Sequence, residues 1–201
     1  MKKIGKVSQI ISMTNYLCSI FKEGEIEHAP SNQDFKFGTM VKIEVKGGSV
    51  VGIITDITTL TPGERIPLKI PDVGQAQRLY PAYYAGMQTL VSVSFLGFIH
   101  TDSNGKMIKI THGFPGIIPE ISNNVWKMDD PEVIIFHKPS EGRLSFGYYS
   151  RFSKEQNFEY AFCILCDQIM GLLPSEAALV KKLKQNVEFL SKIKSFSKGG
   201  A

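Results

Sequence analysis

Apolar and charged side chains alternate along residues 41–46. A period of two is typical of a β-strand with one buried and one solvated face. The glycine pair at 47–48 predicts a tight turn, and the apolar run at 50–57 predicts the returning strand of a hairpin. Gly52 lies inside that run and indicates a bulge or a sharp bend, as barrel strands require.

Further strand signals follow along the chain. An apolar segment at 90–99, a turn at 102–105 and a second apolar segment at 106–111 predict another hairpin. We interpret the first 21 residues as two short strands. Additional strands are predicted near 133–136 and 144–149. Many short strands separated by turn residues are typical of a small barrel or sandwich.

The pattern changes to a helical period after residue 152. Ser153 and Gln156 have the spacing of a capping box, which predicts that a helix begins there. Gly171 and Pro174 are expected to end it, and Ser175 is the expected cap of a second helix. The apolar stripes comprise Phe158, Phe162, Leu165, Ile169 and Leu172 in the first helix and Val180, Leu183, Val187 and Leu190 in the second. A short connection makes these helices a helical hairpin, and residues 195–201 are expected to fray.

These elements predict an α+β protein, in which a small, mainly antiparallel β-barrel is followed by a C-terminal helical hairpin. The barrel is assigned to residues 1–150 and the hairpin to residues 151–201. Residues 61–88 contain four of the ten prolines and are interpreted as an irregular excursion from the sheet, with a short helix near 74–79.

Composition adds few constraints. The 201 residues include 23 Lys and Arg against 19 Asp and Glu, a formal net charge of +4. The excess is local, because residues 1–150 carry 15 basic and 14 acidic residues, whereas residues 151–201 carry 8 and 5. Three cysteines do not indicate a disulfide scaffold and fit a reducing cytosol. With no uninterrupted apolar stretch of about 18 residues and no cleavage signal, we predict a cytoplasmic protein without membrane contact.

Motifs for nucleotide or ester chemistry are absent from the sequence. The two Gly-Lys steps, at 5–6 and 105–106, lack the upstream glycine and the following Ser or Thr of a P-loop. Neither G-x-G-x-x-G nor G-x-S-x-G occurs. His100 and His112 are expected to be neighbours across the predicted hairpin, which would permit a metal site with two histidines. Because no carboxylates converge on them, we prefer to interpret them as loop or rim histidines.

Two small clusters have a chemical and a structural interpretation. Cys163 and Cys166 form a C-x-x-C motif, but zinc requires two more ligands and a thioredoxin-like site requires the motif at a helix start. We interpret the pair as small core residues, with redox or metal chemistry as the alternative. Asp129, Asp130 and Glu132 are compatible with a bound hard cation. We prefer a solvated turn before a strand.

Two groups of side chains are candidates for contact with a partner. Three tyrosines within residues 80–84, next to an arginine, have the composition of a base-stacking platform or of a protein interface, with core packing as the alternative. The last predicted helix has a lysine-rich face, which suits phosphate contacts or an ordinary solvated face. The candidate interaction residues are Tyr80, Tyr83, Tyr84, Arg78, Lys181 and Lys184.

Four short segments carry glycine-centred motifs. Residues 4–7 read Ile-Gly-Lys-Val, residues 37–43 Phe-Gly-Thr-Met-Val-Lys-Ile, residues 51–57 Val-Gly-Ile-Ile-Thr-Asp-Ile and residues 113–116 Gly-Phe-Pro-Gly. In this order they resemble the opening strand, the G-x-x-V strand, the G-x-V-x-x-I strand and the proline-glycine loop of the HAS barrel. That barrel is the small N-terminal domain of HerA-type DNA-translocating ATPases and of rotary ATP synthase subunits. The resemblance covers residues 4–136.

The resemblance implies assembly rather than catalysis. In HerA-type proteins the barrel leads into a P-loop ATPase domain, whereas this chain continues into the predicted helices, so no catalytic residue carries over. The barrel of that family forms a collar around a hexameric ring and docks a nuclease such as NurA. The resemblance therefore implies a module that self-associates or docks onto a HerA-like ATPase and its nuclease partner.

We therefore expect a non-enzymatic interaction module of DNA processing or repair, with no catalytic residue, cofactor or metal. Its partner would be a protein, or a second copy in a homo-oligomer. The alternative is a nucleic-acid-binding barrel that uses the basic helical tail and the Tyr-rich excursion. An enzyme built on Cys163, Cys166 or the histidines and a fragment of a longer ATPase are the remaining alternatives.

Overall fold

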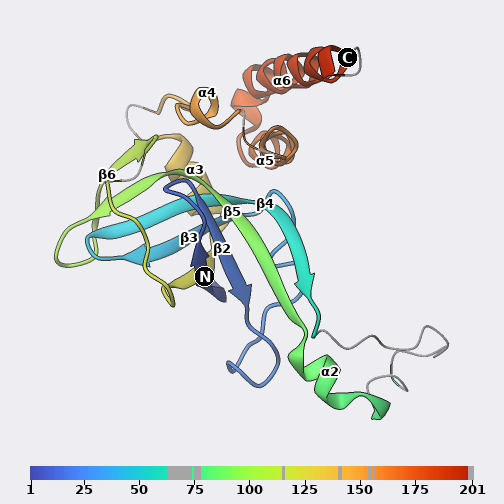
Figure 1. Ribbon diagram of the computed structural model, residues 1–201. Coiled ribbons are helices and arrows are strands. Elements are labelled where there is room, and N and C mark those ends of the chain that lie inside the picture. The colour runs from blue at the N-terminus through green and yellow to red at the C-terminus, as the bar shows by residue number, and fades with distance from the viewer. Residues whose placement is uncertain are drawn as a thin grey trace.

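Seven antiparallel strands build the sheet in the computed structural model of the chain (Figure 1). The strands are β1 (Lys2–Ile10), β2 (Asn15–Ile20), β3 (Met40–Val45), β4 (Gly48–Leu60), β5 (Gln88–Thr101), β6 (Met107–His112) and β7 (Asn124–Lys127). Six of them pair in the order β2-β1-β7-β3-β4-β5, and β5 pairs back with β2, which closes the predicted barrel. The structure describes residues 1–62, 74, 78–114, 116–139, 142–153, 155 and 157–198.

The two longest strands, β4 and β5, organise the sheet. β3 and β4 form the hairpin that the alternation along residues 41–46 predicts, with Val45 opposite Gly48. The first half of β5 pairs with β2 and closes the barrel, whereas its second half pairs with β6. β6 therefore extends the sheet beyond the barrel, and no other described strand pairs with its outer edge.

The predicted bulge at Gly52 is confirmed. The register between β4 and β5 shifts between Val51 and Gly52. A Cβ atom at Gly52 would lie 2.4 Å from Cγ1 of Val93 and 2.9 Å from the carbonyl oxygen of Ser94. Only a glycine therefore lets the two strands approach this closely.

Residues 133–136 are helical, so the strand predicted there is wrong. They belong to α3 (Asp130–His137), which begins with a capping box. The carboxylate of Asp129 accepts the N–H of Glu132 at 3.0 Å, and the carboxylate of Glu132 accepts the N–H of Asp129 at 3.1 Å. Pro131 lies in the first turn, where a helix needs no N–H donor. This start overrides the strand preference of the β-branched residues that follow.

The segment after α3 also differs from expectation. In place of the strand predicted at 144–149, residues 144–148 form a loop that leads into the short helix α4 (Tyr149–Phe152). Ser153 follows the last residue of α4 and therefore does not begin the next helix. Gln156, the other member of the predicted capping box, lies outside the described residues. Asn157 precedes the next helix instead, in the left-handed conformation with φ of 60°.

The C-terminal helices form the predicted pair above the barrel (Figure 1). They are α5 (Phe158–Leu172), the 3-10 turn η1 (Pro174–Glu176) and α6 (Ala177–Lys198). Ser175 lies inside η1. α6 runs through Lys198, and residues 199–201, the end of the segment that we expect to fray, lie outside the described part.

One hydrophobic core joins the helices to the barrel. Phe158, Phe162, Leu165 and Ile169 of α5 are buried in the same cluster as the inward side chains of the strands. The stripe of α6 is buried at Val180 and Val187, half-buried at Leu183 and exposed at Leu190. Within the described residues no helix alone has the length and apolar composition to cross a membrane; α5 and α6 meet that test only as a pair bent by 119°.

Candidate functional site

The predicted interaction residues lie at opposite ends of the molecule. The three tyrosines flank or belong to α2 (Pro81–Gly86) at the bottom of Figure 1, whereas the lysines belong to α6 at the top. Tyr83 and Tyr84 are half-buried and meet edge to face, with ring centroids 5.6 Å apart. Tyr80 is also half-buried and Arg78 is exposed. The two groups therefore do not form one surface. Half of the excursion at 61–88, including the centre of the helix predicted near 74–79, lies outside the described residues.

The two candidate lysines differ in their surroundings. Nζ of Lys184 lies 2.6 and 2.7 Å from the carboxylate oxygens of Asp167 and 3.9 Å from Glu188. The hydrogen bond to Asp167 raises the pKa of Lys184. Its charge is therefore already neutralised within the helix pair, whereas Lys181 is exposed to solvent.

The histidines do not pair as predicted. His100 lies opposite Lys109 and His112 opposite Gly97, so the β5–β6 register separates the two rings. His100 instead contacts the hydroxyl of Thr111 through Nε2, at 3.2 Å. Within the described residues no group of three His, Cys, Asp or Glu side chains could hold a metal ion.

His112 instead approaches a second histidine from α3. Its ring centroid lies 6.5 Å from that of His137 and 5.2 Å from that of Tyr148. Nε2 of His112 donates to the carbonyl oxygen of Phe136 at 3.0 Å, and its Nδ1 accepts the N–H of Gly147 at 3.2 Å. Burial lowers the pKa of His112. These contacts attach the end of β6 to α3 and to the loop before α4.

The cysteines of the C-x-x-C motif belong to the helix core. Cys166 is fully buried and Cys163 half-buried, and neither forms a disulfide. Burial raises the pKa of Cys166 to about 12 and also raises the pKa of Cys163. Because the thiolate is the reactive form, this environment suppresses nucleophilic and redox chemistry. The structure thus agrees with the core interpretation.

The three carboxylates near residue 130 also serve the fold. Asp129 and Glu132 cap α3, and Glu132 in addition accepts Nζ of Lys42 on β3 at 2.6 Å. Asp130 accepts the side-chain amide of Gln168 on α5 at 3.3 Å. The predicted solvated turn before a strand is therefore the start of a helix that is attached to both the barrel and α5.

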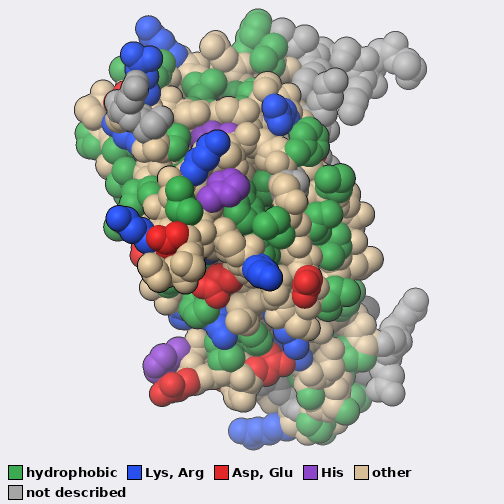
Figure 2. Space-filling model, turned by 90° about the vertical axis from the view of Figure 1, so that its left-hand side faces the viewer, with side chains coloured by type: hydrophobic (Ala, Val, Ile, Leu, Met, Phe, Trp, Pro, Cys, Tyr) green, Lys and Arg blue, Asp and Glu red, His purple; other side chains and the backbone are tan. Residues whose placement is uncertain are grey.

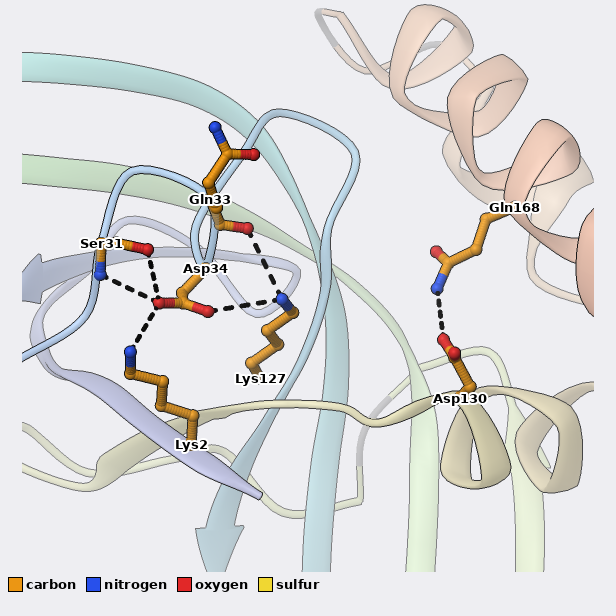
Figure 3. A network of polar contacts seen from close by, with 7 residues as sticks. All are labelled: Lys2, Ser31, Gln33, Asp34, Lys127, Asp130 and Gln168. Carbon is orange, nitrogen blue, oxygen red and sulfur yellow. Dashed lines mark hydrogen bonds and ion pairs between the residues drawn. The ribbon is translucent and has the colours of Figure 1, made fainter. Parts of the chain in front are cut away.

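A cleft of about 650 Å³ lies between the end of the barrel and the helices α3 and α5. Figure 3 shows that Lys2, Ser31 and Lys127 all contact Asp34 on the barrel side of this cleft. The Asp34 carboxylate lies 2.8 Å from Nζ of Lys2 and 3.5 Å from Nζ of Lys127, and it accepts the N–H and the hydroxyl of Ser31, each at 2.9 Å. Burial alone would raise the pKa of Asp34, but the hydrogen bonds from Lys2 and Ser31 outweigh it and hold this pKa well below its usual range.

The charges of this cleft are therefore largely paired within its own walls. The wall opposite Asp34 carries the contact between Asp130 and Gln168 (Figure 3). Lys2 lies on β1, Lys127 ends β7 and Asp34 belongs to the loop before β3. The network thus holds the open end of the barrel together, and we assign these contacts to stability rather than to chemistry.

A group of exposed apolar side chains that the sequence interpretation missed lies on β6 and on the loop that follows it. We call this surface the β6 face; it consists of Met107, Ile108, Phe114, Ile117, Ile118 and Ile121, each 40–66% exposed. Figure 2 looks onto this side of the molecule, and hydrophobic side chains recur over much of it. Because these six side chains belong to one strand and the loop that follows it, we treat this face as a candidate interface.

The loop of the β6 face is fixed at both ends. At its start, Gly113 has φ of 113°, and a Cβ there would lie 2.5 Å from Nη1 of Arg151. The guanidinium of Arg151 in turn lies over the ring of Phe114, 5.6 Å from its centroid. At its end, the N–H of Ser122 donates to the carbonyl oxygen of Val7 on β1 at 2.8 Å. The sequence carries a signal for this face in two pairs of neighbouring apolar residues, Met107-Ile108 and Ile117-Ile118. Each pair lies beside turn residues and interrupts the alternation of apolar and polar side chains.

Comparison with known protein families gives a match over most of the chain. A family model described as a domain of unknown function (DUF8166) matches residues 1–165. The match covers the whole barrel, α3, α4 and the first half of α5, and it ends before α6. No curated protein shows a significant match to the chain.

Proposed function

The chain belongs to the DUF8166 family, and because the description of that family names no activity, we propose from the geometry of the chain itself that it is a non-enzymatic assembly module. In this proposal the barrel docks onto a partner protein or onto copies of itself. The partner would be a HerA-like DNA-translocating ATPase or the nuclease that works with it, and the process would be DNA processing or repair.

The β6 face is the observation that carries this proposal. Six exposed apolar side chains lie within residues 107–121, where β6 pairs with β5 and the loop contacts β1 and α4. Burying apolar surface is the main favourable contribution to most protein association. Contacts that already hold a face in place reduce the conformational entropy that is lost on docking, which favours binding further.

The choice of partner rests on the resemblance of the strand motifs. A closed antiparallel barrel is the kind of domain that this resemblance implies. In HerA-type machines the corresponding barrel serves assembly. The proposal transfers that role, and not the ATPase activity, to this chain.

The proposal is tested by measuring molar mass with light scattering during size-exclusion chromatography. The chain is run alone and mixed with the HerA-type ATPase, or with the nuclease, encoded in the same genome. We expect a complex or an oligomer that the double variant Ile108→Ser and Phe114→Ser loses. The matched control is Leu179→Ser with Phe189→Ser on α6, whose side chains are 56% and 62% exposed.

Two results would contradict the proposal. A chain that stays monomeric at high micromolar concentration and binds neither protein would remove the assembly function. A complex that survives the β6-face variant but not the α6 variant would move the interface to the helices.

A further inference from the structure

β6 presents an unused strand edge. Residues 109–112 pair regularly with residues 97–100 of β5. No other described strand pairs with the opposite edge. The free N–H and C=O groups of such an edge form a template for one more strand. The β6 face therefore offers main-chain hydrogen bonds in addition to apolar side chains.

The charged side chains next to this edge are mainly basic. The segment 103–119 contains Lys106 and Lys109 and neither Asp nor Glu. The nearest preceding carboxylate, that of Asp102, accepts backbone N–H groups of the β5–β6 turn at 2.8 and 2.9 Å and is thereby engaged. Arg151 adds a third cation above the loop. A strand that adds to β6 therefore meets a positive surface.

A second copy of the chain fits this edge poorly. Antiparallel pairing of two β6 edges about Lys109 would place that lysine opposite its own copy, and like charges directly opposite destabilise a sheet. The register with β5 shifts between His100 and Thr101, which leaves Ile108 as an extra residue in β6. This bulge restricts regular pairing of any added strand to residues 109–112, whereas Lys109 disfavours only a strand that places a like charge opposite it.

We infer that β6 accepts an extended segment of a partner protein in which acidic side chains alternate with apolar ones. The main chain of that segment would continue the sheet, its acidic side chains would meet Lys106 and Lys109, and its apolar side chains would cover Ile108 and Ile110. Strand addition of this kind takes affinity from backbone hydrogen bonds and specificity from alternate side chains. This inference rests on the proposed function and specifies its docking mode.

The probe is a synthetic octapeptide of four Glu-Val repeats with blocked ends. A peptide of four Lys-Val repeats tests charge, and a Glu-Val peptide with N-methylated alternate amides tests main-chain pairing. Binding is followed by NMR shifts of backbone amides and by fluorescence anisotropy. We expect the Glu-Val peptide to bind about tenfold more tightly than the Lys-Val peptide, with the largest shifts at residues 107–112. The N-methylated peptide should lose binding.

Charge reversal on the protein supplies the matched pair of variants. Lys109→Glu should reverse the preference between the two peptides, whereas Lys181→Glu, on the exposed face of α6, should leave it unchanged. Both lysines are exposed, so both variants should fold like the parent chain.

The inference is overturned if both peptides bind equally, if the N-methylated peptide binds as well as the unmodified one, or if the shifts lie away from β6. Its failure is separable from that of the proposed function. A partner complex that persists in Lys109→Glu would leave the assembly function standing without strand addition. Peptide binding at β6 with no complex of either named protein would leave strand addition standing without that partner.

Discussion

The hydroxyl of Tyr148 donates a hydrogen bond of 2.8 Å to Nε2 of His137 inside the core. The direction follows from the other ring nitrogen, since Nδ1 of His137 lies 2.8 Å from the carbonyl oxygen of Val133, which can only accept. His137 is fully buried and therefore neutral. Together with His112 it connects α3, the loop before α4 and the end of β6, which supports the β6 face from behind.

Acid is expected to destabilise the protein through His137. Burial, together with the nearby His112, lowers the pKa of His137 to about 4, although the hydrogen bond to Val133 opposes this shift. The unfolded chain, with an ordinary pKa of about 6.5, binds a proton first as the pH falls. The stability that His137 contributes is therefore complete above pH ~6.5 and is lost between ~6.5 and ~4, by up to about 3 kcal/mol.

Urea unfolding between pH 7 and 4.5 measures this loss. The variant His137→Asn should be less stable at pH 7 but should show a shallower decline with pH. His28→Asn is the control, because His28 is exposed and its removal should leave the decline of the parent chain unchanged. Equal slopes for the parent and His137→Asn would show that folding does not shift the pKa of His137.

Removing the Tyr148 hydroxyl should also destabilise the fold. Tyr148→Phe leaves Nε2 of His137 buried without a donor, and an unsatisfied buried acceptor costs about 1–3 kcal/mol. Tyr160→Phe removes the same atom from a side chain that is 67% exposed and should change stability by less than about 0.5 kcal/mol. Thermal and urea unfolding measure both values, and an equal effect of the two variants would contradict the buried hydrogen bond.

The strands could be predicted from the sequence wherever all local signals favour the same structure. Along residues 41–57, alternation, a Gly-Gly turn and one glycine inside an apolar run all point to the same hairpin, and the register confirms it. At residues 133–136 two rules compete. The β-branched side chains favour a strand, whereas Asp129, Pro131 and Glu132 start a helix, and the capping box prevails.

The contacts of the candidate site could not be predicted, because they depend on distance in space. His112 and His137 are 25 positions apart, and only the return of α3 across β5 and β6 brings them together. Similarly, the pairing of Lys184 with Asp167 depends on how α6 bends back on α5. The sequence of a lysine-rich helix face is the same whether or not its lysines form ion pairs with carboxylates in the folded protein.

The approach of α5 to the barrel is expected to depend on Gly38. This residue has φ of 82°, and a Cβ there would lie 2.8 Å from Cγ2 of Ile164 on α5. Gly38→Ala should therefore suffer both backbone strain, about 1–2 kcal/mol, and a steric clash that adds about 1–3 kcal/mol. Gly24→Ala is a matched control, because Gly24 has φ of 85° with no atom within 4 Å of the added Cβ. Urea unfolding should show a clearly larger loss of stability for Gly38→Ala than for Gly24→Ala. Equal losses would show that α5 moves to accommodate the added methyl group without destabilising the fold.

The nucleic-acid alternative makes a different prediction for the two lysines of α6. Lys184 is held by Asp167, whereas Lys181 is exposed, so phosphate contacts would fall on Lys181. Fluorescence anisotropy with a labelled single-stranded oligonucleotide, at low and at physiological salt, measures the affinity and its salt dependence. If the protein is an assembly module, binding should be weak at low salt, vanish at physiological salt and be equal for Lys181→Ala and Lys184→Ala. Tight binding that Lys181→Ala and Tyr83→Ala weaken, while Lys184→Ala does not, would instead assign the protein to nucleic acid.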